Sequence, residues 1–196
     1  MNIIELSKVD NDGWTSLTAA AFGGLEKVCK ALIRKMTDQT INQVTNDGNT
    51  ALTFAAIHGL EKVCEALIPK MTDQAINKVN NYGETALTRA ASKGLSSVCE
   101  AIIPKMTNQA INYIDKYGDT ALTLAAINGH EKVCEALIPK MSDQAINKVN
   151  NNSDIASTYA VVKSLSSVCE LLIPKITEQA INQVNNDGWT SLTAVA

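Results

Sequence analysis

A period of 35 residues runs through this chain of 196 residues and constrains its fold more than any other feature. Cysteines recur at that interval, and so do glycines, apart from one serine. The two series are Cys29, Cys64, Cys99, Cys134 and Cys169, and Gly13, Gly48, Gly83, Gly118, Ser153 and Gly188. The segment NDGWTSLTA also occurs twice, at 11–19 and 186–194, five periods apart. Tandem units of this length cannot bury their apolar surface alone, so a row of stacked units is expected.

The period divides the chain into three predicted parts. These are a partial preceding repeat or N-terminal cap over residues 1–10, five full repeats over 11–185 and a truncated sixth repeat over 186–196. The sixth repeat stops inside its first helix, which leaves Leu192 and Val195 without a second helix to cover them. Two hypotheses remain open: the chain is a fragment of a longer protein, or this uncapped end associates with another molecule, including a second copy.

Each repeat predicts two antiparallel helices. In the second repeat the first helix lies within residues 50–59, where the small side chains of Ala55 and Ala56 allow another backbone to approach closely. The second helix lies within residues 60–71, whose apolar residues have helical spacing. Gly59 between them permits the left-handed turn that folds the pair back on itself.

A short third helix is predicted after each pair. Pro69 cannot donate a backbone hydrogen bond, so it should end or kink the second helix. Thr72 then offers an N-cap oxygen and Asp73 suits the positive start of a helix over residues 72–79. Irregular coil at 72–79 would contradict this prediction.

At this level of detail one repeat resembles a known family. The run DGNTALTFAAIHGLEKVCEALI, which starts at Asp47, is similar to the ankyrin repeat. The resemblance implies an all-α solenoid of stacked helix-turn-helix repeats joined by β-turn or hairpin loops. Two positions depart from the usual pattern: Ala51 stands where proline is usual, and Thr53 stands where histidine is usual. A hydroxyl must therefore make the customary histidine hydrogen bond, or the bond is lost.

Composition and charge narrow the class of protein. The formal net charge is -3, and the cations are scattered among acids, so we expect no nucleic-acid partner. No apolar run approaches the length of a membrane span, and the N-terminus lacks the apolar centre of a signal peptide. We expect a cytoplasmic protein that does not bind membranes. His58 and His130 lie in different repeats without a partner placed by spacing, so neither an enzyme nor a cofactor is predicted.

The five cysteines invite both a structural and a functional interpretation. They recur in the second helices, and equivalent residues of stacked helices lie about 8–10 Å apart, beyond the roughly 7 Å limit for a disulfide. Metal binding needs clustered ligands, and the sequence contains neither a CxxC motif nor paired histidines. We interpret the cysteines as small buried apolar residues in a reducing compartment.

Two polar series recur without exception, Lys35, Lys70, Lys105, Lys140 and Lys175, and Asn42, Asn77, Asn112, Asn147 and Asn182. The lysines could attract an acidic partner, but we favour solvated cations that complement the carbonyl end of the second helix. In ankyrin-like stacks the asparagine is a structural hydrogen-bonding residue, and we adopt that interpretation. Invariance across copies indicates architecture, so a binding site is expected where the copies differ.

The positions that differ predict a partner-binding strip. In ankyrin-like proteins partners usually meet the turn tips and the exposed face of the first helix. Aromatic and aliphatic residues at these nominally exposed positions, with a polar margin, have the composition of an interface centre. The alternative is that several only pack on neighbouring turns. The predicted residues are Asp12, Trp14, Phe22, Asp47, Asn49, Ile57, His58, Tyr82, Glu84, Ser92, Lys93, Tyr117, Asp119, Ile127 and Asn128.

The fifth repeat is predicted to be the weakest. It carries Ser153 and Ser164 in place of glycines and Ser157 in place of a core leucine. A serine held in the left-handed conformation that glycine accepts costs about 1 kcal/mol or more. Local fraying is therefore expected between residues 150 and 165.

Two functions from different classes fit these patterns. The first is a protein-binding module that recruits a partner through its turn tips and its concave first-helix face. Near-identical tandem copies are also similar to ankyrin proteins of intracellular bacteria, which suggests delivery into a host cell. The second is a passive scaffold or spacer within a larger chain, as the unfinished sixth repeat suggests.

Overall fold

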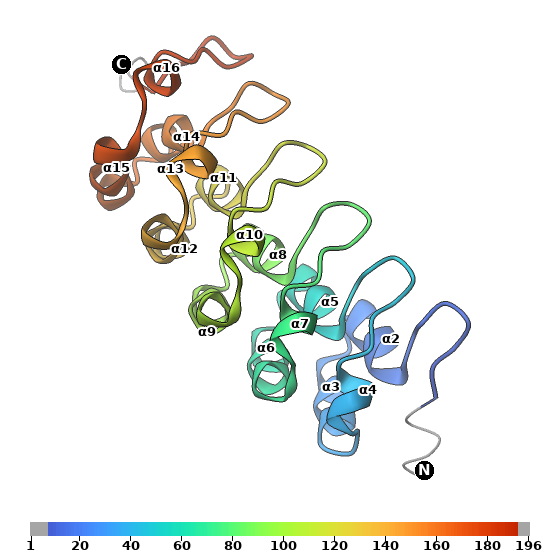
Figure 1. Cartoon of the computed structure of the whole chain (residues 1–196). Helices are drawn as coiled ribbons and strands as arrows, with labels where there is room; N and C mark the ends of the chain where they lie inside the picture. Colours follow the sequence, from blue (N-terminus) through green and yellow to red (C-terminus); the bar gives the residue numbers. More distant parts are fainter. Residues whose placement is uncertain (1–7, 192–196) are drawn as a thin grey trace.

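The computed structural model describes residues 8–191 and shows a solenoid. Figure 1 follows the chain from its blue end to its red end as a row of helical units stacked in sequence order, with long loops on one side. Every regular element in the described range is helical, so the predicted all-α fold is confirmed. The expectations for Leu192, Val195 and residues 1–7 fall outside the described residues.

Each repeat contributes two main helices and a single-turn third helix. The first helices are α2 (Ser16–Phe22), α5 (Ala51–Ile57), α8 (Ala86–Ser92), α11 (Ala121–Ile127) and α14 (Ala156–Val162). The second helices are α3 (Glu26–Ile33), α6 (Glu61–Leu67), α9 (Ser96–Ile102), α12 (Glu131–Leu137) and α15 (Ser166–Leu172). The third helices are α4 (Asp38–Ile41), α7 (Asp73–Ile76), α10 (Asn108–Ile111), α13 (Asp143–Ile146) and α16 (Glu178–Ile181).

Paired threonines begin the first helices. The hydroxyl of Thr50 accepts a hydrogen bond from the backbone N–H of Thr53 at 3.2 Å, and the N–H of Thr50 donates to the Thr53 hydroxyl. This reciprocal arrangement satisfies two backbone donors at the helix start. The hydroxyl that replaces the usual histidine therefore does form hydrogen bonds. In the fifth repeat Ile155 occupies the cap position and supplies no side-chain hydrogen bond.

The predicted third helix is confirmed, although it is only one turn long. Helix α6 ends at Leu67, and the chain continues through Pro69 as a 3₁₀ turn, η1 (Ile68–Lys70). Equivalent turns follow in the next three repeats, η2 (Ile103–Lys105), η3 (Ile138–Lys140) and η4 (Ile173–Lys175). The Thr72 hydroxyl then accepts a hydrogen bond from the Ala75 N–H and caps α7 as expected.

A continuous core runs between the two layers of main helices. The alanine pairs of the inner first helices are almost fully buried, which lets neighbouring helices approach closely. All five thiols are free, and four of them are buried as predicted. Burial raises the pKa of Cys64, Cys99 and Cys134 to about 12. Cys169 is only partly buried, although it still packs against the core.

The invariant asparagines join each third helix to the next repeat. Asn42 donates from Nδ2 to the carbonyl oxygens of Asp38 and Lys70 and accepts at Oδ1 from the Thr72 N–H, at 2.8 Å. The backbone N–H groups of Thr107, Ser142 and Thr177 donate in the same way to the preceding asparagines, at 2.8, 2.8 and 3.0 Å. The structural interpretation of these asparagines is therefore confirmed.

The invariant lysines have a role that the sequence analysis missed. Three of the five reach back to an acid in the third helix of the preceding repeat, in the pairs Lys70–Asp38 at 3.6 Å, Lys105–Asp73 at 3.7 Å and Lys175–Asp143 at 3.2 Å. The residue that precedes Lys140 by the same interval is Asn108, which explains why Lys140 forms no such pair within residues 8–191. Exposed pairs of this kind contribute little stability each, about 0–1 kcal/mol.

Amide exchange should be faster in the fifth repeat than in the third. Ser153 and Ser164 have φ angles of 66° and 55°, and they are the only non-glycine residues with positive φ within residues 8–191. Each costs about 1–2 kcal/mol relative to glycine. We expect lower protection at residues 153–165 than at 83–95, measured by hydrogen–deuterium exchange with mass spectrometry, and partial recovery in Ser153→Gly. Equal protection of the two segments in the natural chain would contradict this expectation.

Candidate functional site

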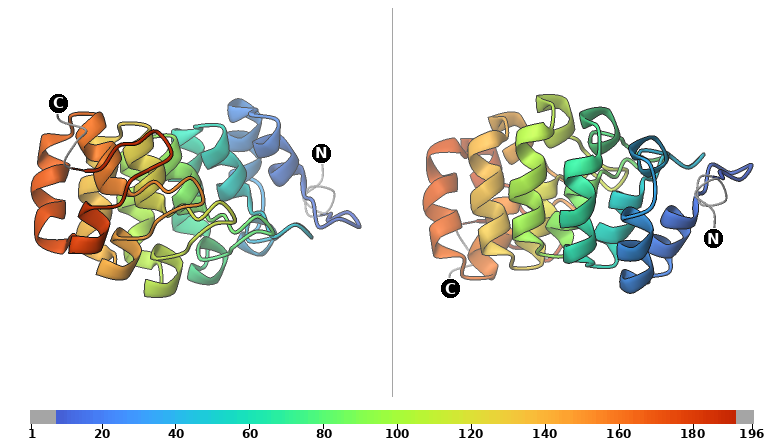
Figure 2. Two further views of the ribbon diagram at one scale, coloured as in Figure 1. Left: turned by 90° about the horizontal axis from the view of Figure 1, so that it is seen from above. Right: turned by 90° about the horizontal axis from the view of Figure 1, so that it is seen from below.

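A groove of about 470 Å³ lies between the loops and the first helices of the first four repeats. Figure 2 shows the loops gathered on one side of the stack, while the second helices form a row of columns seen from below. Eight of the fifteen predicted residues line this groove: Trp14, Phe22, Asp47, Asn49, Ile57, Tyr82, Glu84 and Tyr117. The other residues that line it are Phe54, Asn80, Arg89 and Lys116.

An aromatic cluster forms one half of the groove. Trp14 and Phe54 stack with ring centroids 5.0 Å apart and planes inclined by 17°. Phe22 meets both rings edge-on at 5.3 Å, yet 57% of this residue stays exposed. Ile57 beside them is half-buried against the core. Rings fixed by one another lose little conformational freedom on binding, which suits them to anchor a partner.

Two tyrosines and a lysine form the other half. The Lys116 ammonium lies 4.3 Å from the ring centroid of Tyr82 and 4.9 Å from that of Tyr117. Both tyrosines are about half exposed, at 49% and 55%. The cation is attracted to the negative faces of the two rings and holds the tips of neighbouring loops together. This half of the groove therefore presents two rings and one positive charge.

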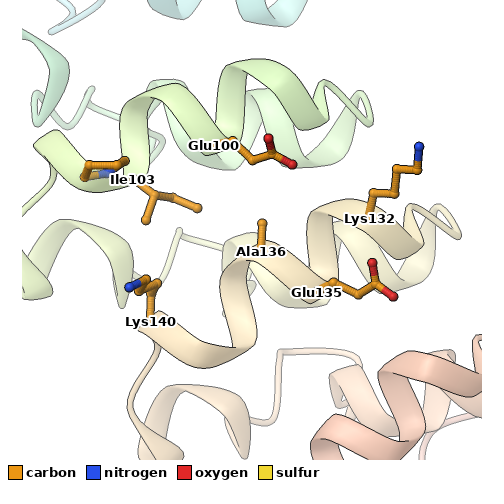
Figure 3. Close-up of a pocket in the computed structure, with 7 residues that line it drawn as sticks. Glu100, Ile103, Lys132, Glu135, Ala136 and Lys140 are labelled. Atoms are coloured by element: carbon orange, nitrogen blue, oxygen red, sulfur yellow. The ribbon is translucent and has the colours of Figure 1, made fainter.

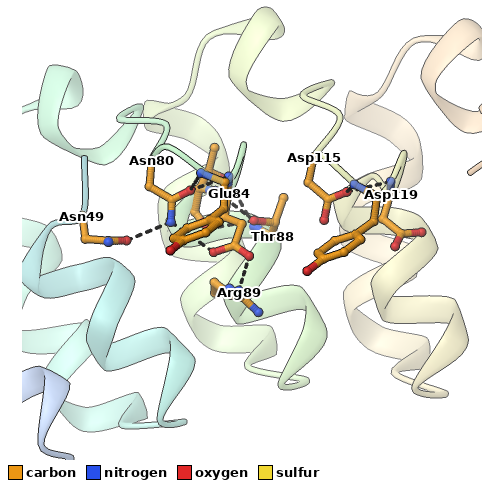
Figure 4. Close-up of polar contacts among 10 residues, drawn as sticks. Asn49, Asn80, Glu84, Thr88, Arg89, Asp115 and Asp119 are labelled. Atoms are coloured by element: carbon orange, nitrogen blue, oxygen red, sulfur yellow. Dashed lines mark hydrogen bonds and ion pairs between the residues drawn. The ribbon is translucent and has the colours of Figure 1, made fainter. Parts of the chain in front are cut away.

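A row of buried polar side chains forms the base of the loops (Figure 4). Asn80 accepts at Oδ1 from the backbone N–H groups of Tyr82 and Glu84, both at 2.9 Å, and so closes its own turn. Its Nδ2 donates to Asn49 Oδ1 at 2.9 Å and to Glu84 Oε2 at 3.0 Å. Arg89 pairs with the other oxygen of Glu84. Asn80 thus ties two successive loops together.

Three of the predicted contact residues are buried. Asn49, Glu84 and Asp119 were expected to be exposed, but none is more than 9% exposed. Asn49 and Asp119 accept hydrogen bonds from the loop that follows, through Asn80 Nδ2 at 2.9 Å and Asn150 Nδ2 at 2.7 Å. Glu84 accepts from Asn80 of its own loop at 3.0 Å. Asn49 and Glu84 line the base of the groove, whereas Asp119 does not line it.

The remaining predicted residues lie at the margins. Asp12 and Asp47 are exposed at loop tips, and the polar residues that follow the first helices, His58, Lys93 and Asn128, are exposed as well. Ser92 and Ile127 are half-buried. Apart from Asp47, none of these residues lines the groove.

The most important omission from the sequence analysis is one position in the first helix. It is occupied in successive copies by Ala19, Phe54, Arg89, Leu124 and Tyr159, and two of these residues line the groove. The residue at this position differs in every copy, so the expectation that a binding site lies where the copies differ applies to it. Its residues directly precede the alanine pair, which the sequence analysis interpreted only as a place where another backbone approaches closely.

Asp119→Asn is expected to stabilise the protein near pH 7. Burial raises the pKa of Asp119 above its ordinary value, and the negative charges of Asp115 and Asp154 raise it further, against the hydrogen bond from Asn150. A carboxyl with a raised folded-state pKa lowers stability once the pH exceeds that value. An amide keeps the acceptor for Asn150, as Asn49 does for Asn80.

The gain in unfolding free energy from Asp119→Asn should therefore decrease as the pH falls through the pKa of Asp119. It should vanish below the ordinary pKa of an aspartate, where the natural side chain is protonated in both states. Urea denaturation of both proteins between pH 3 and pH 8 measures this. A constant difference across the range would show that the Asp119 charge is not responsible.

Within residues 8–191 no three His, Cys, Asp or Glu side chains cluster as metal ligands would. No helix in the same range is both long enough and apolar enough to cross a membrane. A further pocket of about 590 Å³ lies between α9 and α12, among the second helices (Figure 3).

Comparisons with known proteins agree with this architecture. The family model for ankyrin repeats, which comprises three copies, matches residues 2–80 and again residues 71–148. Over 39 residues the chain is 69% identical to an ankyrin repeat protein of Rickettsia bellii strain RML369-C. These 39 residues make up 20% of this chain and 7% of that protein. The chain therefore spans a small part of that relative.

A solved structure extends the likeness to nearly the whole chain. The crystal structure of EF0377, an ankyrin repeat protein, superposes with a TM-score of 0.68 at 24% sequence identity. The match covers 95% of this chain and 92% of that one. At this level of identity the likeness concerns the fold.

Proposed function

Because the chain belongs to the ankyrin repeat family, whose members generally bind proteins, we propose that it recruits a partner protein through the aromatic groove. The groove residues Trp14, Phe22, Phe54 and Tyr82 carry this proposal. They form an apolar surface at positions that differ between copies, on a scaffold that the remaining positions repeat. Aromatic residues of this kind dominate the binding energy of protein interfaces.

The partner segment would insert an apolar side chain among the aromatic rings. Phe22 is largely exposed in the free protein, and its burial on binding would remove apolar surface from water. Lys116 and Asp47 flank the groove with one charge of each sign, so the polar margin would orient the segment. The buried row beneath, including Asn80, holds the loops in place before binding, which reduces the entropy lost on association.

The test compares the natural chain with a variant that carries Phe22→Glu and Tyr117→Glu. Both side chains are more than half exposed, so folding should be preserved, which circular dichroism checks. The matched control carries Gln144→Glu and Gln179→Glu, two exposed positions on α13 and α16 that add the same charge away from the groove.

Immobilised proteins would be used to capture partners from lysates of the source cells and of candidate host cells, followed by mass spectrometry. We expect a protein that is retained by the natural chain and the control and lost by the groove variant. For that protein, titration should show at least about a 30-fold weaker Kd for the groove variant, which corresponds to about 2 kcal/mol. Equal capture by all three proteins would place the site elsewhere. Absence of any specific capture would favour the alternative, a passive scaffold or spacer.

A further inference from the structure

Three successive loops each hold a buried acid at their base, at equivalent positions of the third, fourth and fifth repeats. These acids are Glu84, Asp119 and Asp154, and none is more than 9% exposed. A buried carboxylate costs free energy unless hydrogen bonds or an opposite charge compensate for the lost water. An asparagine side chain donates to one oxygen of each acid, in the pairs Asn80–Glu84, Asn150–Asp119 and Asn185–Asp154, at 3.0, 2.7 and 2.9 Å. One oxygen of each carboxylate therefore has a donor.

The second oxygen receives its donor from the first helix in two of these repeats. Arg89 of α8 pairs with Oε1 of Glu84 (Figure 4). Tyr159 of α14 donates its hydroxyl to Oδ2 of Asp154 at 3.1 Å. Arg89 and Tyr159 each follow their acid by five residues, so both donors reach the carboxylate from the same side, that of the first helix.

The fourth repeat lacks this donor. The residue that follows Asp119 by five positions is Leu124, whose side chain has no polar atom. Within residues 8–191 no group donates to Oδ2 of Asp119, although only 9% of this residue is exposed. Asp119 therefore presents a carboxylate oxygen without a donor, on the side from which Arg89 reaches Glu84.

Asp115 in the same loop leaves a second carboxylate oxygen without a donor. Its Oδ1 accepts from the backbone N–H groups of Tyr117 and Asp119, at 2.8 and 2.9 Å, but nothing in the described part of the chain donates to its Oδ2. The neighbouring loops have Asn80 and Asn150 at this position, and an amide can donate where Asp115 cannot. Two buried carboxylates of one loop thus each have an unpaired oxygen.

The charges around Asp119 favour a cation at this place. Burial raises the pKa of Asp119, and the negative charges of Asp115 and Asp154 raise it further, against the hydrogen bond from Asn150. Lys116 lies over two tyrosine rings and forms an ion pair with none of these acids within residues 8–191. A positive group beside the free oxygen would supply the missing donor and would be attracted by all three carboxylates.

From this arrangement we propose that the partner carries a lysine or an arginine whose side chain binds Asp119, in the way that Arg89 binds Glu84. This rests on the proposed function, because it describes a second side chain of the same partner segment. Tyr117 lines the groove in its fourth and last repeat and lies two residues before Asp119, so a segment that continues past Tyr117 reaches this acid. The partner motif is an apolar side chain for the aromatic rings followed by a basic one.

The test begins with a display library of random dodecapeptides selected on the immobilised natural chain. Phe22→Glu alters the groove three repeats away from Asp119, so peptides that bind the natural chain but not this variant occupy the groove. We expect these peptides to share an apolar and a basic residue. The tightest of them is then synthesised in two forms, one with its basic residue and one with glutamine in that place, and fluorescence anisotropy measures the Kd of each.

Two variants isolate the contact with Asp119. Asp119→Asn removes the charge and keeps the acceptor for Asn150, whereas Leu124→Arg keeps the acid and supplies a donor from within the chain, as Arg89 does in the third repeat. The matched control is Glu65→Gln, at an exposed position of α6 among the second helices. Glutamine in the peptide should weaken binding to the natural chain and to the control by at least about tenfold. For both variants the same replacement should change the Kd by less than about twofold.

The outcomes separate this inference from the proposed function, once circular dichroism has shown that each variant is folded. Peptides that depend on Phe22 but share no basic residue would overturn the inference and leave the groove as a binding site. So would an equal loss of affinity from the glutamine replacement on the natural chain and on either Asp119→Asn or Leu124→Arg. If no peptide is enriched, or if none depends on Phe22, the inference fails together with the proposed function.

Discussion

Leu87→Ala is expected to lower the unfolding free energy by about 2.7–5 kcal/mol, the range measured for large-to-small leucine substitutions in a protein core. Leu87 lies in α8 of the central repeat and is fully buried. The substitution removes apolar contacts and leaves a cavity that the stacked helices on both sides cannot fill by moving independently. Because domains of this size have about 5–15 kcal/mol of stability, a large share of the total would be lost.

Leu171→Ala is the matched control for that experiment. It is the same substitution, but the side chain is 39% exposed, and alanine is the residue at this position in the other four copies. We expect a change within about 0.5 kcal/mol. Guanidinium denaturation followed by circular dichroism measures both variants at low protein concentration. A loss below 1 kcal/mol for Leu87→Ala would show that the centre of the stack is not closely packed.

The second large effect is expected for Gly48→Ala, in a loop that lines the groove. Gly48 has a φ angle of +83°, which costs a residue with a side chain about 1–2 kcal/mol. An added Cβ would also lie 2.8 Å from the Cα of Asn80 and 2.9 Å from the carbonyl oxygen of Val79. These are backbone atoms of the next loop, so they cannot rotate away, and overpacking adds about 1–3 kcal/mol.

Gly59→Ala separates the cost of the positive φ angle from the cost of the contact between the added Cβ and the next loop. Its φ angle is +66°, but apart from its two chain neighbours no residue has an atom within 4 Å of the position of an added Cβ. It should therefore lose only the conformational part, about 1–2 kcal/mol, and leave the groove unchanged. Gly48→Ala should in addition displace the loop of Asn80 and weaken the capture of a partner. If both variants lose the same stability, the close approach of successive loops contributes nothing.

Most of the fold was predictable because its determinants act over a few residues. Thr72 caps the third helix through a hydrogen bond to a backbone group three residues away, and Pro69 limits the preceding helix through its own missing N–H. Ser153 was expected to be strained, and it does adopt a positive φ angle. Each of these effects is a property of a short segment, and the 35-residue period repeats it along the chain.

The groove was only partly predictable. Trp14, Phe22 and Tyr82 were identified because they differ between copies and are unusual at nominally exposed positions. Phe54 was missed, although the same rule applies to it, because it stands next to an alanine pair that belongs to the core. Lys116 was missed because its role depends on the rings of two loops, Tyr82 and Tyr117, and one of them lies in the preceding repeat.

The sequence by itself determined the number of repeats, the order of helices within each, their caps and turns, and which positions vary. Only the tertiary structure decided which polar residues are buried and which are free to meet a partner. Asn49 and Asn80 are 31 residues apart, and Lys70 and Asp38 are 32 apart, and both pairs join neighbouring repeats. Whether such a side chain is paired depends on the residue that the next repeat places beside it, as Asn108 opposite Lys140 shows. Local periodicity carries no information about that pairing until the stacking geometry is known.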